Sequence, residues 1–285
     1  MNGILIINKE QNWTSNDVVQ KVKRITGEKV GHTGTLDPLA TGVLPLLIGK
    51  GTLLSKYLVN HDKTYIAKVK LGVKTDTADL EGEVIEKETI EDIFFEEKKI
   101  KEVLNSFVGK QKQTPPMYSA IKIKGKKLYE YARNGQVVDI PKRDIEIYEM
   151  NLINFSKEFG EIEFKVSCSK GTYIRTLCED IATKLGTIGT MSSLNRIRVG
   201  QFEIKDAIKI EEINDTVLDK KIITIEKFFE DRKSIQLSSE ELDLFLNGVK
   251  LSRKEEDGVY RIYCCNRFIG VGALCGEYLK RDIIV

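Results

Sequence analysis

The chain has 285 residues, of which 41% are hydrophobic and 31% charged, and its formal net charge is +2. This length suggests one large domain, or one domain with a small companion, and the apolar content is sufficient for a buried core. No window reaches about eighteen consecutive apolar residues, so no transmembrane helix is expected. The N-terminal segment has no basic start before its apolar run, which argues against a secretory signal.

The cysteines and histidines show no metal-binding spacing. The five cysteines are Cys168, Cys178, Cys264, Cys265 and Cys275, and the two histidines are His32 and His61. An odd number of cysteines without zinc-site spacing indicates a cytoplasmic protein with free thiols. A multi-histidine metal site is not expected.

Apolar periodicity predicts strands and helices mixed along the chain. Residues 3–8 read as a buried strand, and the next segment reads as a helix with a capping box of Thr14 and Asp17 and a stop at Gly27. Alternation over 64–72 and 161–169 predicts two further strands. A helix follows, with Thr172 as its cap. Because strict βαβ alternation is missing, we expect a mixed sheet flanked by helices.

Positive charge is concentrated in one segment. Residues 110–143 contain seven Lys and two Arg against Glu130 and Asp139, a net of +7, so the rest of the chain sums to −5. A basic segment in a mildly acidic chain is typical of a polyanion-binding protein. A solvated charged loop is the alternative interpretation.

The pattern changes near residue 231. A short polar linker is followed by a capped helix and then by three short apolar runs, which we interpret as strands. Residues 235–285 are therefore predicted to form a small β-rich module.

The segment Val30–Gly49 carries one formal charge, Asp37. Glycines at 31, 34 and 42, together with Pro38, predict a loop over 30–42. An Asx-turn would explain an isolated Asp-Pro. The flanks here are apolar, however, so the carboxylate is expected to be half-buried and to need a cation or donors to stay ionised. That setting makes Asp37 a functional candidate.

One isolated carboxylate supports few kinds of chemistry. A metal site needs further oxygen ligands, and glycoside hydrolysis needs a second placed carboxylate. The loop also lacks the lysine of a P-loop. A lone nucleophile or general base remains, with a cation from elsewhere. Arg175 is the candidate cation, because it falls in the first turn of a predicted helix, where the dipole disfavours positive charge. An ordinary surface arginine is the alternative.

Four motifs in order carry a family resemblance: GHTGTLDPLATGVLP, KTYIAKVKLGVKTDTADLEG, SKGTYIRTLCEDIATKLG and SLNRIRVGQF. They closely resemble the bacterial tRNA pseudouridine-55 synthases, the TruB-type family. The resemblance spans about residues 3–205, and the C-terminal fifty residues are similar to the family's short RNA-binding module. One departure is Asn195, where many members carry a second basic residue.

The resemblance implies an α+β fold. A mixed central β-sheet flanked by helices would form the catalytic domain, residues 1–230, with an RNA-binding insertion at about 110–143. Residues 235–285 would form a small PUA-like RNA-binding module.

The resemblance also implies an activity. The family isomerises uridine 55 in the tRNA T-loop to pseudouridine, without metal or cofactor, after the base leaves its stack. Asp37 matches the catalytic aspartate, as covalent nucleophile or as base at the 2′ carbon, and Arg175 matches its arginine partner. Tyr65 matches the tyrosine that stacks on the flipped base. The remaining matches are His32, near the vacated base position, and Tyr173 and Leu194, which line the uridine pocket.

Partners follow from the same resemblance. The T-arm of tRNA would be held through phosphate contacts by Lys122, Lys124, Lys126, Lys127 and Arg133. We expect the basic segment to be mobile in the free protein and to close on the RNA. A monomer that needs no protein partner and works in the cytoplasm is expected.

Three alternatives remain at this point. An RNA-binding or tRNA-folding protein would bind without chemistry as its main role. A pseudouridine synthase for another RNA, including a guide-directed type, would share the motifs, although long basic tails are missing. A base glycosidase is disfavoured because no second carboxylate stands out.

Overall fold

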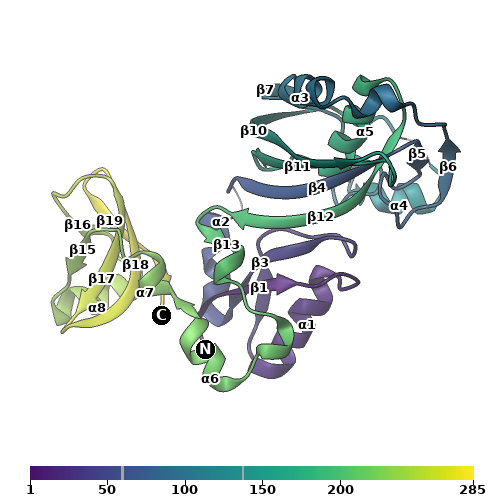
Figure 1. Ribbon diagram of the computed structural model, residues 1–285. Helices are drawn as coiled ribbons and strands as arrows, with labels where there is room; N and C mark the ends of the chain where they lie inside the picture. The colour runs from purple at the N-terminus through teal and green to yellow at the C-terminus, as the bar shows by residue number, and fades with distance from the viewer. Residues whose placement is uncertain (59–60, 137) are drawn as a thin grey trace.

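The computed structural model describes residues 1–58, 61–136 and 138–285, so Val137 of the predicted insertion lies outside the described residues (Figure 1). Its main body is a mixed sheet in the order β14-β1-β3-β12-β4-β11-β10-β7, with β2 beside β3 and β13 beside β12. These strands are β1 Gly3–Lys9, β2 Val30–His32, β3 Thr41–Ile48, β4 Lys63–Leu71, β7 Gly109–Gln113, β10 Arg143–Ser156, β11 Glu161–Cys168, β12 Gly189–Val199, β13 Phe202–Glu203 and β14 Ile223–Thr224. The predicted α+β class and mixed sheet are confirmed.

The helices of the main body are short and amphipathic. They are α1 Ser15–Thr26, α2 Ser55–Leu58, α3 Glu97–Asn105, α4 Leu128–Arg133, α5 Ile174–Leu185, α6 Asp215–Lys221 and α7 Ile225–Phe228. The 3-10 turns are η1 Gly49–Leu54, η2 Asp92–Phe95, η3 Ile204–Asp206 and η4 Ile210–Glu212. Figure 1 shows α3 and α5 on the same side of the sheet half that contains β4, β10 and β11. Across the described residues, no helix has the length and apolarity needed to span a membrane.

The cap predicted for α1 is present. Thr14 Oγ1 accepts a hydrogen bond from the Asp17 amide at 3.1 Å, and Asp17 accepts one from the Thr14 amide at 2.9 Å. Gly27 ends the helix with φ of 68°, a left-handed conformation that glycine adopts without strain. Val18, Val19 and Val22 are buried, as the periodicity predicts.

The cap predicted for α5 is wrong. Tyr173, not Thr172, occupies the position before the helix and makes no side-chain cap bond. The Thr172 hydroxyl instead donates to the Ser169 carbonyl at 3.0 Å, because it lies in the turn that precedes the helix. The buried face of α5 follows the sequence pattern, with Ile174, Leu177, Cys178, Ile181 and Leu185 in the core.

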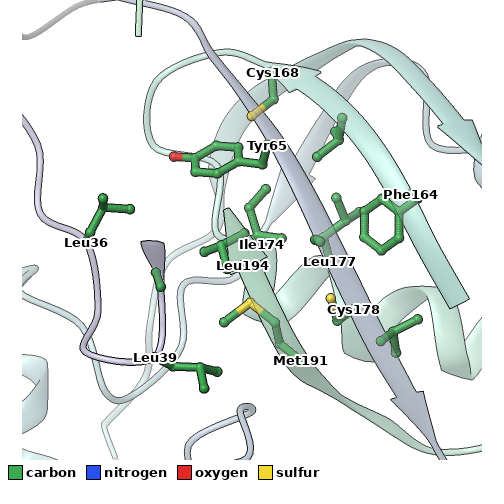
Figure 2. Close-up of a cluster of buried hydrophobic side chains, with 14 of the residues drawn as sticks. Leu36, Leu39, Tyr65, Phe164, Cys168, Ile174, Leu177, Cys178, Met191 and Leu194 are labelled. Carbon is green, nitrogen blue, oxygen red and sulfur yellow. The ribbon is translucent and has the colours of Figure 1, made fainter. Parts of the chain in front are cut away.

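Two apolar cores lie on opposite faces of the β1–β3 region. The larger core joins α1, α3 and α5 to the sheet, and its residues around Phe164 and Leu177 are drawn in Figure 2. The smaller core packs Ile4, Ile6 and Val43 against Val271 and Ile283 of the C-terminal module. The module is therefore attached to the main body through apolar side chains.

The C-terminal module has its own sheet and core. The strand order is β15-β17-β18-β19-β16, with bounds β15 Ser234–Gln236, β16 Leu251–Ser252, β17 Gly258–Cys264, β18 Arg267–Cys275 and β19 Tyr278–Ile284. Helix α8, Ser239–Leu246, begins at the capped Ser238. The buried core of the module includes Phe245 of α8, Ile262 of β17 and Leu279 of β19. The β-rich module expected from the sequence is confirmed.

The basic segment contains more regular structure than its turn-rich sequence indicates. Lys110 and Lys112 lie in β7 of the main sheet, opposite Glu146 and Asp144 of β10. Opposite charges in register explain why this part of the segment joins the sheet. The rest includes the hairpin of β8, Lys122–Ile123, and β9, Lys126–Lys127, followed by α4.

Candidate active site

A cavity of about 440 Å³ lies between the Asp37 loop, the start of α5 and the entry to the basic segment. Its wall contains Asp37, Tyr65, Tyr173, Arg175 and Leu194, which the sequence predicts as site residues. It also contains Thr35, Leu36, Tyr118, Ser119, Ala120, Tyr129, Thr172 and Ile174. Five candidates from four separate sequence regions therefore meet at one hollow.

Buried polar side chains fix the backbone of the Asp37 loop. Ser15 Oγ donates to the Leu36 carbonyl at 3.0 Å and accepts from the Leu36 amide at 2.8 Å. Lys9 Nζ donates to the Pro38 carbonyl at 3.3 Å, and also to the carbonyls of Glu10 and Trp13 at 2.9 and 2.6 Å. The residue on each side of Asp37 is thus held, which limits where the carboxylate can move.

Arg196 clamps the other end of the loop. Its guanidinium is 1% exposed and donates to the carbonyls of Gly34, Thr35 and Val43 at 3.0, 3.4 and 2.8 Å. The close approach of β3 and β12 depends on Gly42, whose φ is 106° and where a Cβ would lie 2.2 Å from the Arg196 carbonyl. Only glycine fits there without moving the strands.

Asp37 forms the ion pair that the sequence predicts. Arg175 Nε lies 3.2 Å from Asp37 Oδ2, and the two side chains are 8% and 36% exposed. The carboxylate is therefore held by a buried guanidinium on one side and remains open to the cavity on the other. The arginine stands in the first turn of α5, so the carboxylate also offsets the unfavourable dipole there.

Three further groups hold the Arg175 guanidinium. Nη1 donates to the Thr77 carbonyl at 3.0 Å, and Nη2 donates to the Tyr118 carbonyl at 2.7 Å. Asp79 Oδ2 lies 3.6 Å from Nη1, and Asp79 is 4% exposed. Asp79 itself accepts from the Thr77 hydroxyl at 2.7 Å and the Glu81 amide at 3.1 Å. The arginine is therefore bracketed by two carboxylates, one buried and one facing the cavity.

Strand register brings Tyr65 to the site. Tyr65 on β4 is the cross-strand partner of Arg196 on β12, and Ala67 is the partner of Leu194. Tyr65 and Leu194, both 7% exposed, therefore share one face of the sheet. In Figure 2 the Tyr65 ring lies at the edge of the apolar cluster near Ile174 and Leu194, with its hydroxyl directed away from Phe164.

The Tyr65 phenol is neutral over a wide pH range. Burial raises the pKa of Tyr65 to about 12, and the nearby positive charge of Arg196 acts in the opposite direction. An apolar ring with a protonated hydroxyl is suited to stacking against a planar base.

Tyr173 is positioned through its backbone. The Gln113 side chain accepts from the Tyr173 amide at 2.8 Å and donates to the Tyr173 carbonyl at 3.0 Å. This two-point contact substitutes for a side-chain cap at the start of α5. It also ties the end of β7 to the cavity wall.

His32 is the one predicted substrate-binding residue that does not line the cavity. It ends β2, opposite Leu46 of β3, on the strand that leads into the Asp37 loop. Burial and the nearby Arg196 lower the pKa of His32, and its Nδ1 has no hydrogen-bonding partner among the described residues. A neutral, partly buried imidazole five residues before Asp37 therefore lies outside the hollow.

The predicted phosphate-binding residues lie on the β8–β9 hairpin and α4. Lys122, Lys124, Lys126 and Arg133 are exposed, and Lys127 is half-buried. Lys127 Nζ and the Arg133 guanidinium lie 5.2 and 5.4 Å from the centre of the Tyr129 ring, and Tyr129 lines the cavity. Two of these positive charges, on Lys127 and Arg133, therefore contact a tyrosine that forms part of the cavity wall.

Sequence reasoning missed Lys9, Ser15, Asp79 and Arg196. Lys9 and Ser15 bond only to backbone groups, and the groups of the Asp37 loop that they hold lie 21 or more residues away, so nothing in their own spacing marks them. Asp79 stands in a segment that reads as an ordinary turn. Arg196 lies within the motif SLNRIRVGQF and Asp79 within the motif KTYIAKVKLGVKTDTADLEG, and these two motifs were the available signals. Within the described ranges, no group of three or more His, Cys, Asp or Glu residues could hold a metal ion.

Family comparison decides how this geometry is classified. The sequence profile described as "TruB family pseudouridylate synthase (N terminal domain)" matches residues 22–174. The chain belongs to the TruB family of pseudouridylate synthases. The profile described as "tRNA pseudouridylate synthase B C-terminal domain" matches the adjoining residues 175–233. As a family member the chain is an enzyme of the isomerase class.

Curated relatives match nearly the whole chain. A protein of Clostridium kluyveri named tRNA pseudouridine synthase B is 43% identical over 280 residues, 95% of either chain. Proteins with the same name from Clostridium tetani and Francisella tularensis are 44% and 41% identical, covering 98% and 100% of this chain and 98% and 97% of their own.

Solved structures share the fold. The crystal structure of a Cbf5-Nop10-Gar1 complex contains a chain that superposes with a TM-score of 0.69 at 23% identity, covering 99% of this chain and 83% of its own. A structure of an H/ACA RNP bound to a substrate RNA containing 2′-deoxyuridine gives 0.69 at 21% identity, covering 99% and 85%. The likeness at this identity establishes the common architecture.

Proposed function

We propose that this protein isomerises uridine 55 in the T-loop of tRNA to pseudouridine. The observation that carries the proposal is the Asp37–Arg175 ion pair, 3.2 Å apart, on the wall of a cavity that also presents Tyr65 and Leu194. The name of the relatives, tRNA pseudouridine synthase B, supports tRNA as the substrate. The enzyme is proposed to act in the cytoplasm as a monomer.

The reaction needs an ionised carboxylate beside a sheltered base. The target uridine turns out of its stack, and its ring enters the cavity against Tyr65. The bond between C1′ and N1 breaks and its electron pair leaves with N1. The uracil turns, C5 bonds to C1′, C5 loses its proton and N1 gains one, so the composition is unchanged. Asp37 acts as the nucleophile at C1′ or as the base at C2′.

The other side chains have supporting roles in the proposal. Arg175 orients Asp37, and Leu194 and Ile174 give the apolar surroundings in which a detached base stays bound and water is excluded. His32 precedes the Asp37 loop and does not line the cavity itself, and it is proposed to approach the position that the base vacates. Lys122, Lys124, Lys126, Lys127 and Arg133 hold the RNA backbone.

Mapping the product tests the proposal. Unmodified tRNA is incubated with the protein, and pseudouridine is located at nucleotide resolution. We expect one new pseudouridine, at position 55. Modification elsewhere in the tRNA, or only in another RNA, would contradict the assigned substrate. Tight tRNA binding without any pseudouridine would instead indicate an RNA-binding or tRNA-folding protein.

A further inference from the structure

The hydroxyl of Ser119 is an unsatisfied polar group at the cavity. Ser119 is 5% exposed and belongs to the cavity wall. Its Oγ is buried and has no hydrogen-bonding partner among the described residues. Burying a hydroxyl without a partner destabilises a folded protein. An orphan hydroxyl at a substrate cavity is therefore a candidate ligand-binding group.

The main chain of Ser119 is already fully used. Its amide donates to the Met117 carbonyl at 3.0 Å, and its carbonyl accepts from the Tyr129 amide at 3.1 Å. These bonds fix the segment that leads from β7 into the β8–β9 hairpin. The hydroxyl adds nothing to that local structure, so its role lies elsewhere.

Tyr173 lines the same cavity as Ser119, and burial raises the pKa of its phenol. Ser119 comes from the entry to the basic segment, whereas Tyr173 precedes α5. Each hydroxyl can donate and accept, and the serine hydrogen rotates freely. Catalytic hydrogen bonds are often poorly aligned until the substrate is present.

We propose that the Ser119 hydroxyl binds a ring carbonyl of the uracil while the detached base turns over. This inference rests on the proposed function. Turning the ring about its N3–C6 axis exchanges N1 with C5, which the isomerisation requires, and also exchanges O2 with O4. A neutral donor that holds one carbonyl before the turn therefore meets the other carbonyl after it. No bond other than those of the isomerisation forms or breaks.

Ser119→Ala tests this with matched substrates. Single-turnover pseudouridine formation is measured on tRNA carrying uridine, 2-thiouridine or 4-thiouridine at the target position, because sulfur is a weak acceptor. We expect the parent to be slowed about tenfold by at least one thio substitution, as for loss of one hydrogen bond at the site. Ser119→Ala should be about tenfold slower on uridine and show little further thio penalty. Its tRNA affinity should be unchanged.

Stability separates this role from a structural one. Removing an unpaired buried hydroxyl should leave the Tm of Ser119→Ala equal to or above that of the parent. Thr33→Val is the matched control, because Thr33 is 9% exposed, has an orphan Oγ1 and does not line the cavity. Thr33→Val should keep the thio penalty of the parent.

Three results would overturn the inference. One is a Ser119→Ala rate on uridine within twofold of the parent. Another is an unchanged thio penalty in Ser119→Ala, or a parent that is indifferent to both sulfur substitutions. The third is a Tm loss that accounts for the lower activity. A parent that forms no pseudouridine on the uridine substrate would instead contradict the proposed function.

Discussion

Arg175 Nη2 donates a 2.7 Å hydrogen bond to the carbonyl of Tyr118. The same guanidinium contacts Asp37 of the Asp37 loop and the carbonyl of Thr77. Thr77 lies in the turn between strand β5 (Val73–Thr75) and strand β6 (Val84–Lys87). One side chain therefore joins three segments that are distant in sequence. Any movement of the basic segment at Tyr118 would therefore also shift the Arg175 guanidinium relative to Asp37.

Arg175→Lys should lower the single-turnover rate by about a hundredfold or more. Lysine keeps the charge but cannot serve Asp37, the Thr77 carbonyl and the Tyr118 carbonyl together, because it lacks the planar fork. Arg24→Lys, on the exposed side of α1, is the control and should behave as the parent. Activity of Arg175→Lys within threefold of the parent would show that charge alone is sufficient.

Tyr65→Phe and Tyr65→Leu should behave differently. Phenylalanine retains the flat ring and should keep tRNA affinity, whereas leucine removes the stacking surface and should weaken binding of the flipped nucleotide by about tenfold. Equilibrium binding and single-turnover rates are compared for both variants. Equal loss of binding by the two variants, with catalysis intact, would contradict the stacking role.

Lys9 predicts an alkaline limb in the pH–activity profile. Burial lowers the pKa of Lys9 from 10.5 to about 8. The folded protein thus releases this proton before the unfolded chain does, so this group makes the free energy of unfolding rise between about pH 8 and 10.5. Activity should change in the opposite direction, because deprotonation weakens the hold on the Pro38 carbonyl and removes positive charge beside Asp37.

The Lys9 effect is checked by measuring single-turnover rates from pH 6 to 10, a range chosen around the pKa of about 8. We expect the parent rate to fall with a midpoint near 8, as that pKa predicts. Lys9→Gln should be slower at neutral pH and should lack this limb. An identical limb in both proteins would assign it to another group.

The hairpin lysines should contribute to RNA binding through phosphate contacts. Replacing Lys122, Lys124, Lys126 and Lys127 with alanine should weaken tRNA binding and reduce the slope of log K against log salt by up to about 3.6. Alanines at Lys98, Lys101, Lys220 and Lys221 on α3 and α6 give the same change in net charge and serve as the control. Base choice should survive. Equal slopes for the two variants would mean that the hairpin is only a solvated surface.

The sequence was most informative where a residue type conflicts with its surroundings. Asp37 stands alone in an apolar run and Arg175 stands at the wrong end of a helix dipole, and the structure places each beside the other. Both conflicts involve only neighbouring residues, so they can be recognised in the sequence alone. The capping box of α1 and the apolar faces of α1 and α5 were predictable for the same reason.

The residues that hold the Asp37 loop in place could not be predicted in this way. Lys9, Ser15 and Arg196 hold the Asp37 loop through backbone carbonyls and amides that lie far away in the chain, and every residue carries such groups. The pairing of Lys110 and Lys112 with β10 depends on strand register, which charge composition does not report. Mobility of the basic segment remains a prediction.

The most direct test of the account is the parent compared with Asp37→Asn on unmodified tRNA. Pseudouridine at position 55 is quantified over time, and tRNA affinity and Tm are measured on the same preparations. We predict that Asp37→Asn keeps its fold and its tRNA affinity but loses the rate by several orders of magnitude, because the ionised carboxylate is missing. Turnover by Asp37→Asn within about tenfold of the parent would contradict the assignment of Asp37 as the reacting group.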